Sequence, residues 1–190
     1  MFNLKNNDLV FAKVKPNAII PNKEDENAGF DIYACFDEDY MIIPAHSTKL
    51  IPTGIASAMT EEYYLQVHER GSTGTKGMKY GAGVIDSGYR NEIFVCINNV
   101  NNKDLYISKL NRNELIEKEF PYDPDNYSTV TGSNDAKNKL YEAIIYPYEK
   151  AIAQLIVHKV HKMNVMEVSY DELKSIPSKR GMGALGSSGK

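Results

Sequence analysis

Glycine-rich segments at two places in the first half of the chain contain residue types suited to binding and cleaving a phosphate ester. The first runs from His68 to Gly77 and contains Arg70, Gly71 and Ser72. Glycines let backbone N–H groups approach an oxyanion, hydroxyls donate hydrogen bonds, and an arginine binds phosphate through two N–H groups. Lys76 stands where a Walker A loop requires glycine, so this is no P-loop. We interpret it as an anion-binding loop, with a solvated turn as the alternative.

The second segment runs from Gly81 to Arg90 and contains one carboxylate, Asp86, followed three residues later by Tyr89. A hairpin with this spacing can place a carboxylate beside a flat aromatic face, which suits a general base next to a sugar or a nucleobase. The alternative is an Asp-Ser-Gly turn with Tyr89 packed on its neighbours.

The chain ends in a third candidate segment, residues 178–190, which holds four glycines, three serines, three basic residues and no acid. An arginine followed by glycines and paired serines, here Arg180 with Ser187 and Ser188, is typical of a flap that orders on a phosphate. A frayed terminus is the alternative.

These segments need a scaffold, and residues 1–100 predict one made of short strands. Apolar and polar residues alternate over 10–14 and 30–34, β-branched and aromatic runs cover 63–67 and 93–97, and turn residues separate them. Many short strands without βαβ alternation indicate an antiparallel all-β sandwich or barrel.

Residues 101–147 have a different composition, rich in Asn, Asp, Lys and Glu, and we interpret them as a partly helical insertion. Helices are expected over 111–118 and after Ser133, where Ala136, Leu140 and Ile144 recur every four residues up to Pro147. Strand pattern resumes over 151–160 and near 163–168. The predicted organisation is one β domain over 1–177, including this insertion, and a flexible tail over 178–190.

Composition excludes several classes of protein. The chain has 190 residues, 42% hydrophobic and 25% charged, with a net charge of −3, which argues against a surface that coats nucleic acid. Two distant cysteines, Cys35 and Cys96, exclude a disulfide framework or a cysteine zinc cluster. The sequence has no apolar run long enough for a membrane span and no signal-peptide pattern at its start, so we expect a cytoplasmic protein.

Five segments, in order, resemble the motifs of the trimeric dUTPase family. They are residues 28–34, the loop around Arg70, residues 83–90, Ile152-Ala153-Gln154-Leu155, and the tail around Arg180. The resemblance implies an all-β, jelly-roll-like barrel of the dUTPase β-clip type, assembled as a homotrimer. It also implies Mg²⁺-dependent hydrolysis of dUTP to dUMP and pyrophosphate, with three subunits contributing to each site.

The resemblance also implies a role for each motif residue. Asp86 matches the acid that activates water, and Tyr89 matches the ring beneath the deoxyribose. The backbone of Gly83, Val84 and Ile85 matches the part of the hairpin that recognises uracil. Arg70 and Gln154 match the residues that place the α-phosphate, and Asp31 matches the acid that supports metal-bound waters. The tail that closes over the nucleotide is matched by Arg180, Leu185, Gly186, Ser187 and Ser188.

The sequence departs from the family pattern at three places. Gly71 follows Arg70 where the family usually has serine, which leaves Ser72 as the nearby hydroxyl. Residues 149–151 read Glu-Lys-Ala instead of Gly-Asp-Arg, and Leu185 replaces the phenylalanine that stacks on uracil.

Two alternative functions remain open. A dCTP deaminase-like enzyme shares the fold but places a glutamate at a position near Cys96, and the sequence around Cys96 offers none beyond Glu92. The other alternative is a regulatory protein that binds a partner protein through residues 101–147, which are rich in tyrosine and charge.

Overall fold

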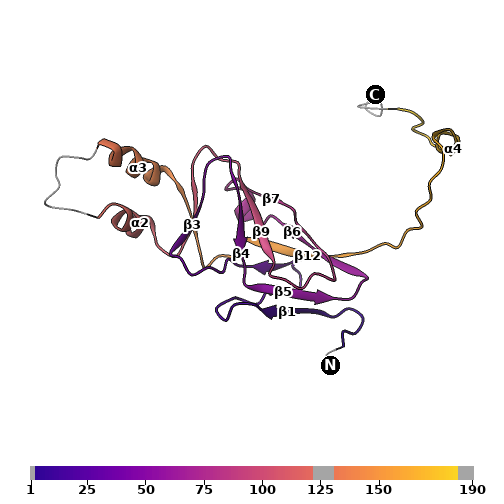
Figure 1. The fold of residues 1–190 in the computed structure, drawn as a ribbon, viewed down its shortest axis with the longest axis horizontal. Helices are drawn as coiled ribbons and strands as arrows, with labels where there is room; N and C mark the ends of the chain where they lie inside the picture. Colours follow the sequence, from indigo (N-terminus) through magenta and orange to yellow (C-terminus); the bar gives the residue numbers. More distant parts are fainter. Residues whose placement is uncertain (1–2, 122–130, 184–190) are drawn as a thin grey trace. The chain divides into compact units, whose positions relative to one another are not determined.

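Short antiparallel strands dominate the computed structural model, which describes residues 3–121 and 131–183 (Figure 1). The chain divides into two units, Met1–Val160 and His161–Lys190. The first contains the expected all-β fold. Residues 161–177, expected in the β domain, group instead with the tail.

A four-stranded sheet carries several of the predicted site residues. It consists of β2 (Gly29–Ile32), β12 (Ala153–Lys159), β6 (Tyr63–His68) and β8 (Val84–Ile85), in that order. Gln154 pairs with Asp31 on one side and with His68 on the other, while the next residue, Leu155, is fully buried. Because side chains alternate along a strand, Asp31 and Gln154 share the face that points away from the core.

Three smaller sheets complete the β fold. They are β4 (Thr48–Pro52), β9 (Phe94–Asn99) and β7 (Met78–Gly81); β1 (Leu9–Lys13) with β5 (Ile55–Met59); and β3 (Tyr40–Ile43), β10 (Leu105–Ser108) and β11 (Ile144–Pro147). Only β10 and β11 pair in parallel among the described strands. The strands predicted around 10–14, 30–34, 63–67, 93–97 and 151–160 are therefore confirmed.

All four sheets contribute to one hydrophobic core. Its fully buried side chains include Ile32, Ile43, Ile55, Leu65 and Ile97. Burying each such side chain stabilises the fold by about 1.5–3 kcal/mol.

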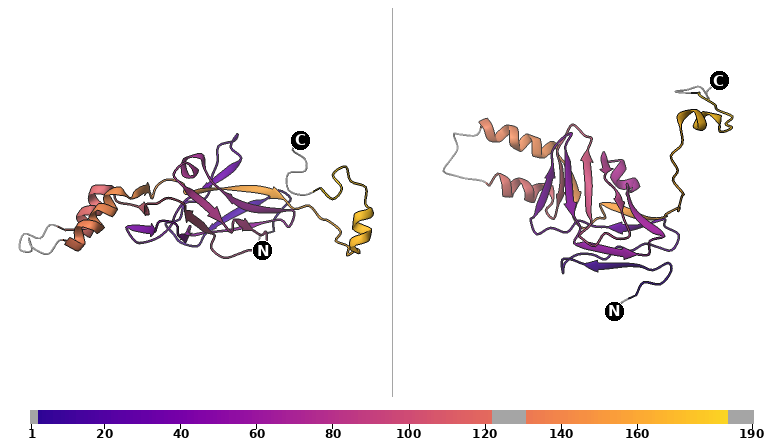
Figure 2. Two further views of the ribbon diagram at one scale, coloured as in Figure 1. Left: turned by 90° about the horizontal axis from the view of Figure 1, so that it is seen from above. Right: turned by 45° about the vertical axis from the view of Figure 1, so that its right-hand side comes forward.

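The predicted insertion is only partly separate from this core. Leu105 and Ile107 of β10 and Tyr146 of β11 belong to the main core, so residues 101–147 begin and end as strands of the β fold. The helical part consists of α2 (Arg112–Glu119) and α3 (Thr131–Glu142), which lie side by side in Figure 1 and in the right-hand view of Figure 2.

The two helices pack through a small apolar cluster of their own, made of Leu115, Ile116, Leu140 and Ala143. Asn111 caps α2 by accepting hydrogen bonds from the backbone N–H groups of Asn113 (2.9 Å) and Glu114 (3.1 Å), which confirms the first predicted helix. The second prediction is wrong at its end: α3 stops at Glu142, and Ile144 begins β11.

Two short helices remain. A single turn, α1 (Gly71–Gly74), forms within the predicted anion-binding loop, where Thr73 is fully buried and its hydroxyl accepts a hydrogen bond from the Arg70 N–H at 3.0 Å. In the second unit, α4 (Tyr170–Ser175) begins after Ser169. The strand expected near 163–168 is wrong, because residues 161–169 form neither strand nor helix. Within the described ranges, no helix is both long and apolar enough to cross a bilayer.

Candidate active site

One cavity of the β unit brings together site residues from three of the predicted motifs. It has a volume of about 410 Å³ and is lined by Asn27, Ala28, Gly29, Asp31, Arg70, Gly71, Ser72 and Gln154. We call it the phosphate pocket, after the ligand that the sequence predicts for it. Its polar lining comes from β2, α1 and β12, which are far apart in sequence and adjacent in the fold.

A two-point ion pair fixes the arginine of this pocket. Arg70 Nε donates to Asp31 Oδ1 at 2.8 Å and Nη2 donates to Asp31 Oδ2 at 2.9 Å. Both side chains are about one-third exposed, at 30% for Arg70 and 31% for Asp31. Because the guanidinium is planar, two parallel hydrogen bonds determine its orientation as well as its position. Asp31 therefore aims Arg70 within the pocket.

Gln154 is held in the same pocket by the backbone of the loop. Its Nε2 donates to the carbonyl oxygen of Glu69 at 2.7 Å. A Cβ at Gly29 would lie only 2.6 Å from Gln154 Oε1, so Gly29 leaves the space that the amide occupies. By contrast, a Cβ at Gly71 would meet nothing within 4 Å. The pocket therefore requires glycine at position 29 and not at position 71. Gly29 lies within the predicted motif of residues 28–34, but no role was predicted for it.

The predicted general base lies in a second cavity, formed by the hairpin after β8. This nucleoside pocket has a volume of about 270 Å³ and is lined by Leu50, Ala82, Val84, Ile85, Asp86, Tyr89, Ile93 and Phe94. The Tyr89 N–H donates to the Asp86 carbonyl at 3.1 Å and closes the turn. The Asp86 side chain and the Tyr89 ring are both exposed. A carboxylate and an accessible aromatic face thus share one apolar-lined pocket, as the spacing predicted.

Backbone contacts hold this hairpin against β6. The Val67 N–H donates to the Gly83 carbonyl at 2.8 Å, and a Cβ at Gly83 would approach the Val67 carbonyl oxygen to 3.0 Å. Tyr89 donates its hydroxyl proton to the Glu92 carbonyl at 3.0 Å. The turn therefore presents Asp86 and Tyr89 from a fixed backbone.

Asp31 and Asp86 lie at opposite edges of the four-stranded sheet. Asp31 is on β2, Asp86 directly follows β8, and β12 and β6 lie between them. Neighbouring strands are about 4.8 Å apart, so three steps separate the strands next to which Asp31 and Asp86 lie by about 14 Å. Gln154 pairs with His68, whereas Ile85 pairs with Leu65, so the two pockets are also offset by about 10 Å along β6. Among the described residues, none lines both pockets. A single chain thus keeps the predicted base away from the predicted phosphate ligands.

The tail residues fall into two groups. Arg180 is described, and its Nε donates to the Gly183 carbonyl at 3.1 Å within the second unit. The other predicted tail residues, Leu185, Gly186, Ser187 and Ser188, lie outside the described residues.

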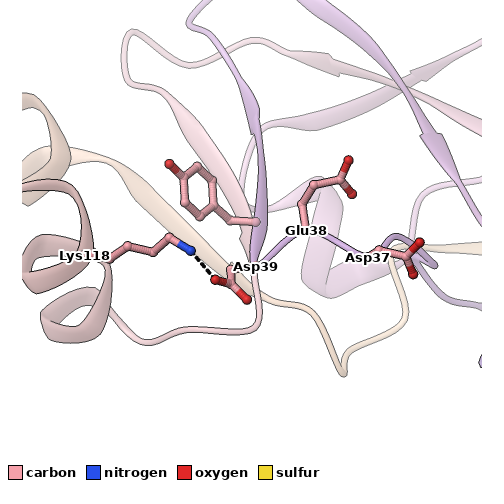
Figure 3. Close-up of a pocket in the computed structure, with 5 residues that line it drawn as sticks. Asp37, Glu38, Asp39 and Lys118 are labelled. Atoms are coloured by element: carbon pink, nitrogen blue, oxygen red, sulfur yellow. Dashed lines mark hydrogen bonds and ion pairs between the residues drawn. The ribbon is translucent and has the colours of Figure 1, made fainter.

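A larger cavity near α2 has the wrong charge for a nucleotide. It measures about 490 Å³ and is lined by Asp37, Glu38, Asp39, Tyr40 and Lys118 (Figure 3). The ammonium of Lys118 pairs with Asp39, and this ion pair lowers the pKa of Asp39. Because the lining has three carboxylates and only one cation, its net negative charge would repel a triphosphate.

Two tyrosines beside the phosphate pocket, the buried Tyr146 and the partly buried Tyr80, were not predicted from the sequence. Tyr146 of β11 donates its hydroxyl proton to the Ala151 carbonyl at 2.7 Å, and Tyr80 of β7 donates to the Ile152 carbonyl. Burial raises the pKa of both hydroxyls, so they remain neutral donors. The apolar and aromatic run at 144–147 was a usable strand signal for Tyr146, but the four-residue spacing ending at Ile144 suggested a helix.

Comparisons with known proteins identify the family to which the chain belongs. The sequence profile of the dUTPase family matches residues 15–113. A deoxyuridine 5'-triphosphate nucleotidohydrolase of Leptospira interrogans is 31% identical over 99 residues, covering 50% of this chain and 68% of the relative. One of the same name from Candida albicans is 28% identical over 177 residues, covering 92% and 84%.

Solved structures show the same fold. The dUTPase of Staphylococcus bacteriophage 80alpha with dUPNHPP superposes with a TM-score of 0.66 at 19% identity, covering 97% of this chain and all of that one. Since the family profile spans just over half of the sequence and the fold agrees, this chain belongs to the dUTPase family.

Proposed function

We propose that this protein hydrolyses dUTP to dUMP and pyrophosphate through attack of water on the α-phosphate. The observation that carries the proposal is the pairing of two pockets with complementary chemistry in a member of the dUTPase family. The nucleoside pocket offers a carboxylate beside an exposed aromatic ring, and the phosphate pocket offers an oriented guanidinium, a hydroxyl and an amide.

In this mechanism Asp86 takes the proton of the attacking water. A carboxylate within reach of that water raises its nucleophilicity by general-base catalysis. Arg70 and Gln154 hold the α-phosphate in line with the water and stabilise the charge that develops on its oxygens. Tyr89 packs beneath the deoxyribose and excludes a 2′-hydroxyl.

The donor set fits Mg²⁺ as an ion brought by the nucleotide. Both carboxylate oxygens of Asp31 accept hydrogen bonds from Arg70, which leaves this residue suited to hold metal-bound waters rather than the ion itself. The part of the chain that the structure describes contains no group of three or more acidic, His or Cys side chains arranged to hold a metal. A bound Mg²⁺ would neutralise triphosphate charge through the phosphate oxygens.

The separation of the two pockets favours a site shared between subunits. A general base must lie within about 3 Å of the proton that it takes, or act through one water. Asp86 of one chain is about 14 Å from Asp31 across the sheet and about 10 Å from Gln154 along β6, so Asp86 of one subunit serves the phosphate pocket of its neighbour. In the proposed homotrimer, the third subunit supplies the tail: Arg180, Ser187 and Ser188 bind the γ-phosphate, while Leu185 and Gly186 cover the base.

Pyrophosphate release from a panel of nucleotides tests this function. We expect turnover of dUTP in Mg²⁺ and loss of turnover in excess EDTA. Turnover of dTTP and UTP should be at least about tenfold lower, because one extra methyl or hydroxyl in a close-fitting pocket costs that much or more. Turnover of dCTP should be at least about tenfold lower too, because its amino group and bare ring nitrogen reverse the donor and acceptor that uracil presents to the hairpin backbone. Equal turnover of dUTP and dTTP would contradict uracil specificity, and ammonia release from dCTP would indicate a deaminase instead.

A further inference from the structure

We propose that Tyr146 is a positioning residue for Arg70, so that the strand leaving the helical insertion helps to build the phosphate pocket. The inference rests on the proposed function, in which Arg70 binds phosphate. The carbonyl oxygen of Ala151 accepts hydrogen bonds from both side chains, from Tyr146 Oη at 2.7 Å and from Arg70 Nη1 at 3.4 Å. A carbonyl oxygen has two lone pairs and can serve both donors.

The free edge of the Arg70 guanidinium is the part that needs this support. Asp31 binds Nε and Nη2, and Nη1 has only longer contacts, to Ser72 Oγ at 3.3 Å and to the Ala151 carbonyl. Tyr146 is 1% exposed, so its hydroxyl reaches the Ala151 carbonyl from inside the core. Arg70 and Ser72 lie close enough to lower the pKa of Tyr146, although burial raises it by more. The hydroxyl therefore stays protonated and donates.

The short bond from Tyr146 fixes the acceptor that Arg70 uses. Ala151 comes just before β12, and the next residue is anchored on both sides: the Ile152 N–H donates to the Ile32 carbonyl at 2.9 Å, and Tyr80 donates to the Ile152 carbonyl. Two tyrosines from different strands, one buried and one partly buried, thus hold consecutive carbonyls. This arrangement fixes the position of the Ala151 carbonyl oxygen that Arg70 Nη1 contacts.

Tyr146 also connects the pocket to the helical insertion. It lies on β11, which begins directly after the apolar cluster that includes Leu140 and Ala143. Arg112, the first residue of α2, donates to the carbonyls of Leu140 (2.5 Å), Tyr141 (2.6 Å) and Ala143 (2.7 Å) at the end of α3. These hydrogen bonds connect the two helices directly before β11 begins. We therefore infer that the packing of the two helices helps to set the position of Tyr146 in the core.

Binding of a non-hydrolysable dUTP analogue to the full-length protein tests the inference through a double-mutant cycle. Tyr146→Phe removes one neutral hydrogen bond, and we expect the Kd of the analogue for this variant to be about fivefold higher than for the wild type. In an Arg70→Lys background, which has no Nη1, the same change should have no further effect. Tyr106→Phe is the matched control on the neighbouring strand β10, where the centroids of the Tyr106 and Tyr40 rings are 5.5 Å apart. The Kd of the analogue for this control should equal that for the wild type.

The outcomes separate positioning from general stability. A Kd unchanged by Tyr146→Phe, or raised by the same factor in both backgrounds, would overturn the inference, because a purely structural role does not depend on Nη1. NMR of the Arg70 guanidinium, assigned by its loss in Arg70→Lys, gives a second test. Rotation about Nε–Cζ should be faster in Tyr146→Phe than in the wild type and Tyr106→Phe, because Asp31 alone then restrains the guanidinium, and equal rates would refute the proposal. Failure of the wild type to hydrolyse dUTP would instead refute the proposed function.

Discussion

Replacing Asp86 by Asn is expected to lower kcat for dUTP about 10²–10⁴-fold, the usual cost of losing a general base. Asparagine has nearly the same shape as aspartate but cannot take a proton from water. The fold should be unaffected, because the side chain is exposed and the turn is closed through the Asp86 backbone carbonyl. Steady-state pyrophosphate release measures kcat, and the Kd of a non-hydrolysable analogue should change little.

Asp37→Asn is the matched control for this variant. It removes an exposed carboxylate from the acidic cavity near α2, outside both proposed pockets, and kcat should stay at the wild-type value. Near wild-type turnover by a folded Asp86→Asn protein would remove Asp86 from the mechanism.

Arg70→Leu is expected to produce the second largest loss, about a hundredfold in kcat/KM. One charge-assisted hydrogen bond contributes roughly 1.5–3 kcal/mol, which corresponds to roughly 10–150-fold, and the variant also leaves Asp31 without its partner. The leucine cannot bind phosphate, and the unpaired Asp31 carboxylate then repels the triphosphate. Thermal unfolding should move little, since a partly exposed ion pair contributes about 0–1 kcal/mol.

Lys13→Leu controls for loss of positive charge alone. Lys13 is exposed at the end of β1, and its removal should leave kcat/KM unchanged. If Arg70→Leu retained wild-type kcat/KM, the phosphate pocket would not be the place where the triphosphate binds.

Local patterns in the sequence predicted the strands well, because alternation and β-branched runs are properties of single segments. They could not predict that Arg70 pairs with Asp31, 39 residues away, since that contact depends on which strands become neighbours. Only the resemblance to a family placed the two residues in one site. The distance between the two pockets likewise follows from strand order, which no single segment encodes.

The errors have local physical causes. Apolar spacing extended the second predicted helix to Ile144, but Ile144, Ile145 and Tyr146 are β-branched and aromatic and pair with β10 instead. Met163 and Val165 alternate as in a strand, yet they are 79% and 94% exposed, and a strand needs a neighbour with which to pair. A partner protein at the insertion stays a prediction.

Co-expression of the Asp86→Asn and Arg70→Leu chains, distinguished by two affinity tags, tests most directly whether subunits share the dUTP-hydrolysing site. In mixed trimers, a site is intact when one subunit supplies Arg70 and its neighbour supplies Asp86. Every mixed trimer has one intact site in three, whichever chain is present twice, so purified mixed trimers should recover about one third of the wild-type kcat. Activity no higher than that of the two variants expressed separately would contradict a shared site and would place Asp86 and Arg70 in the same chain's catalytic centre.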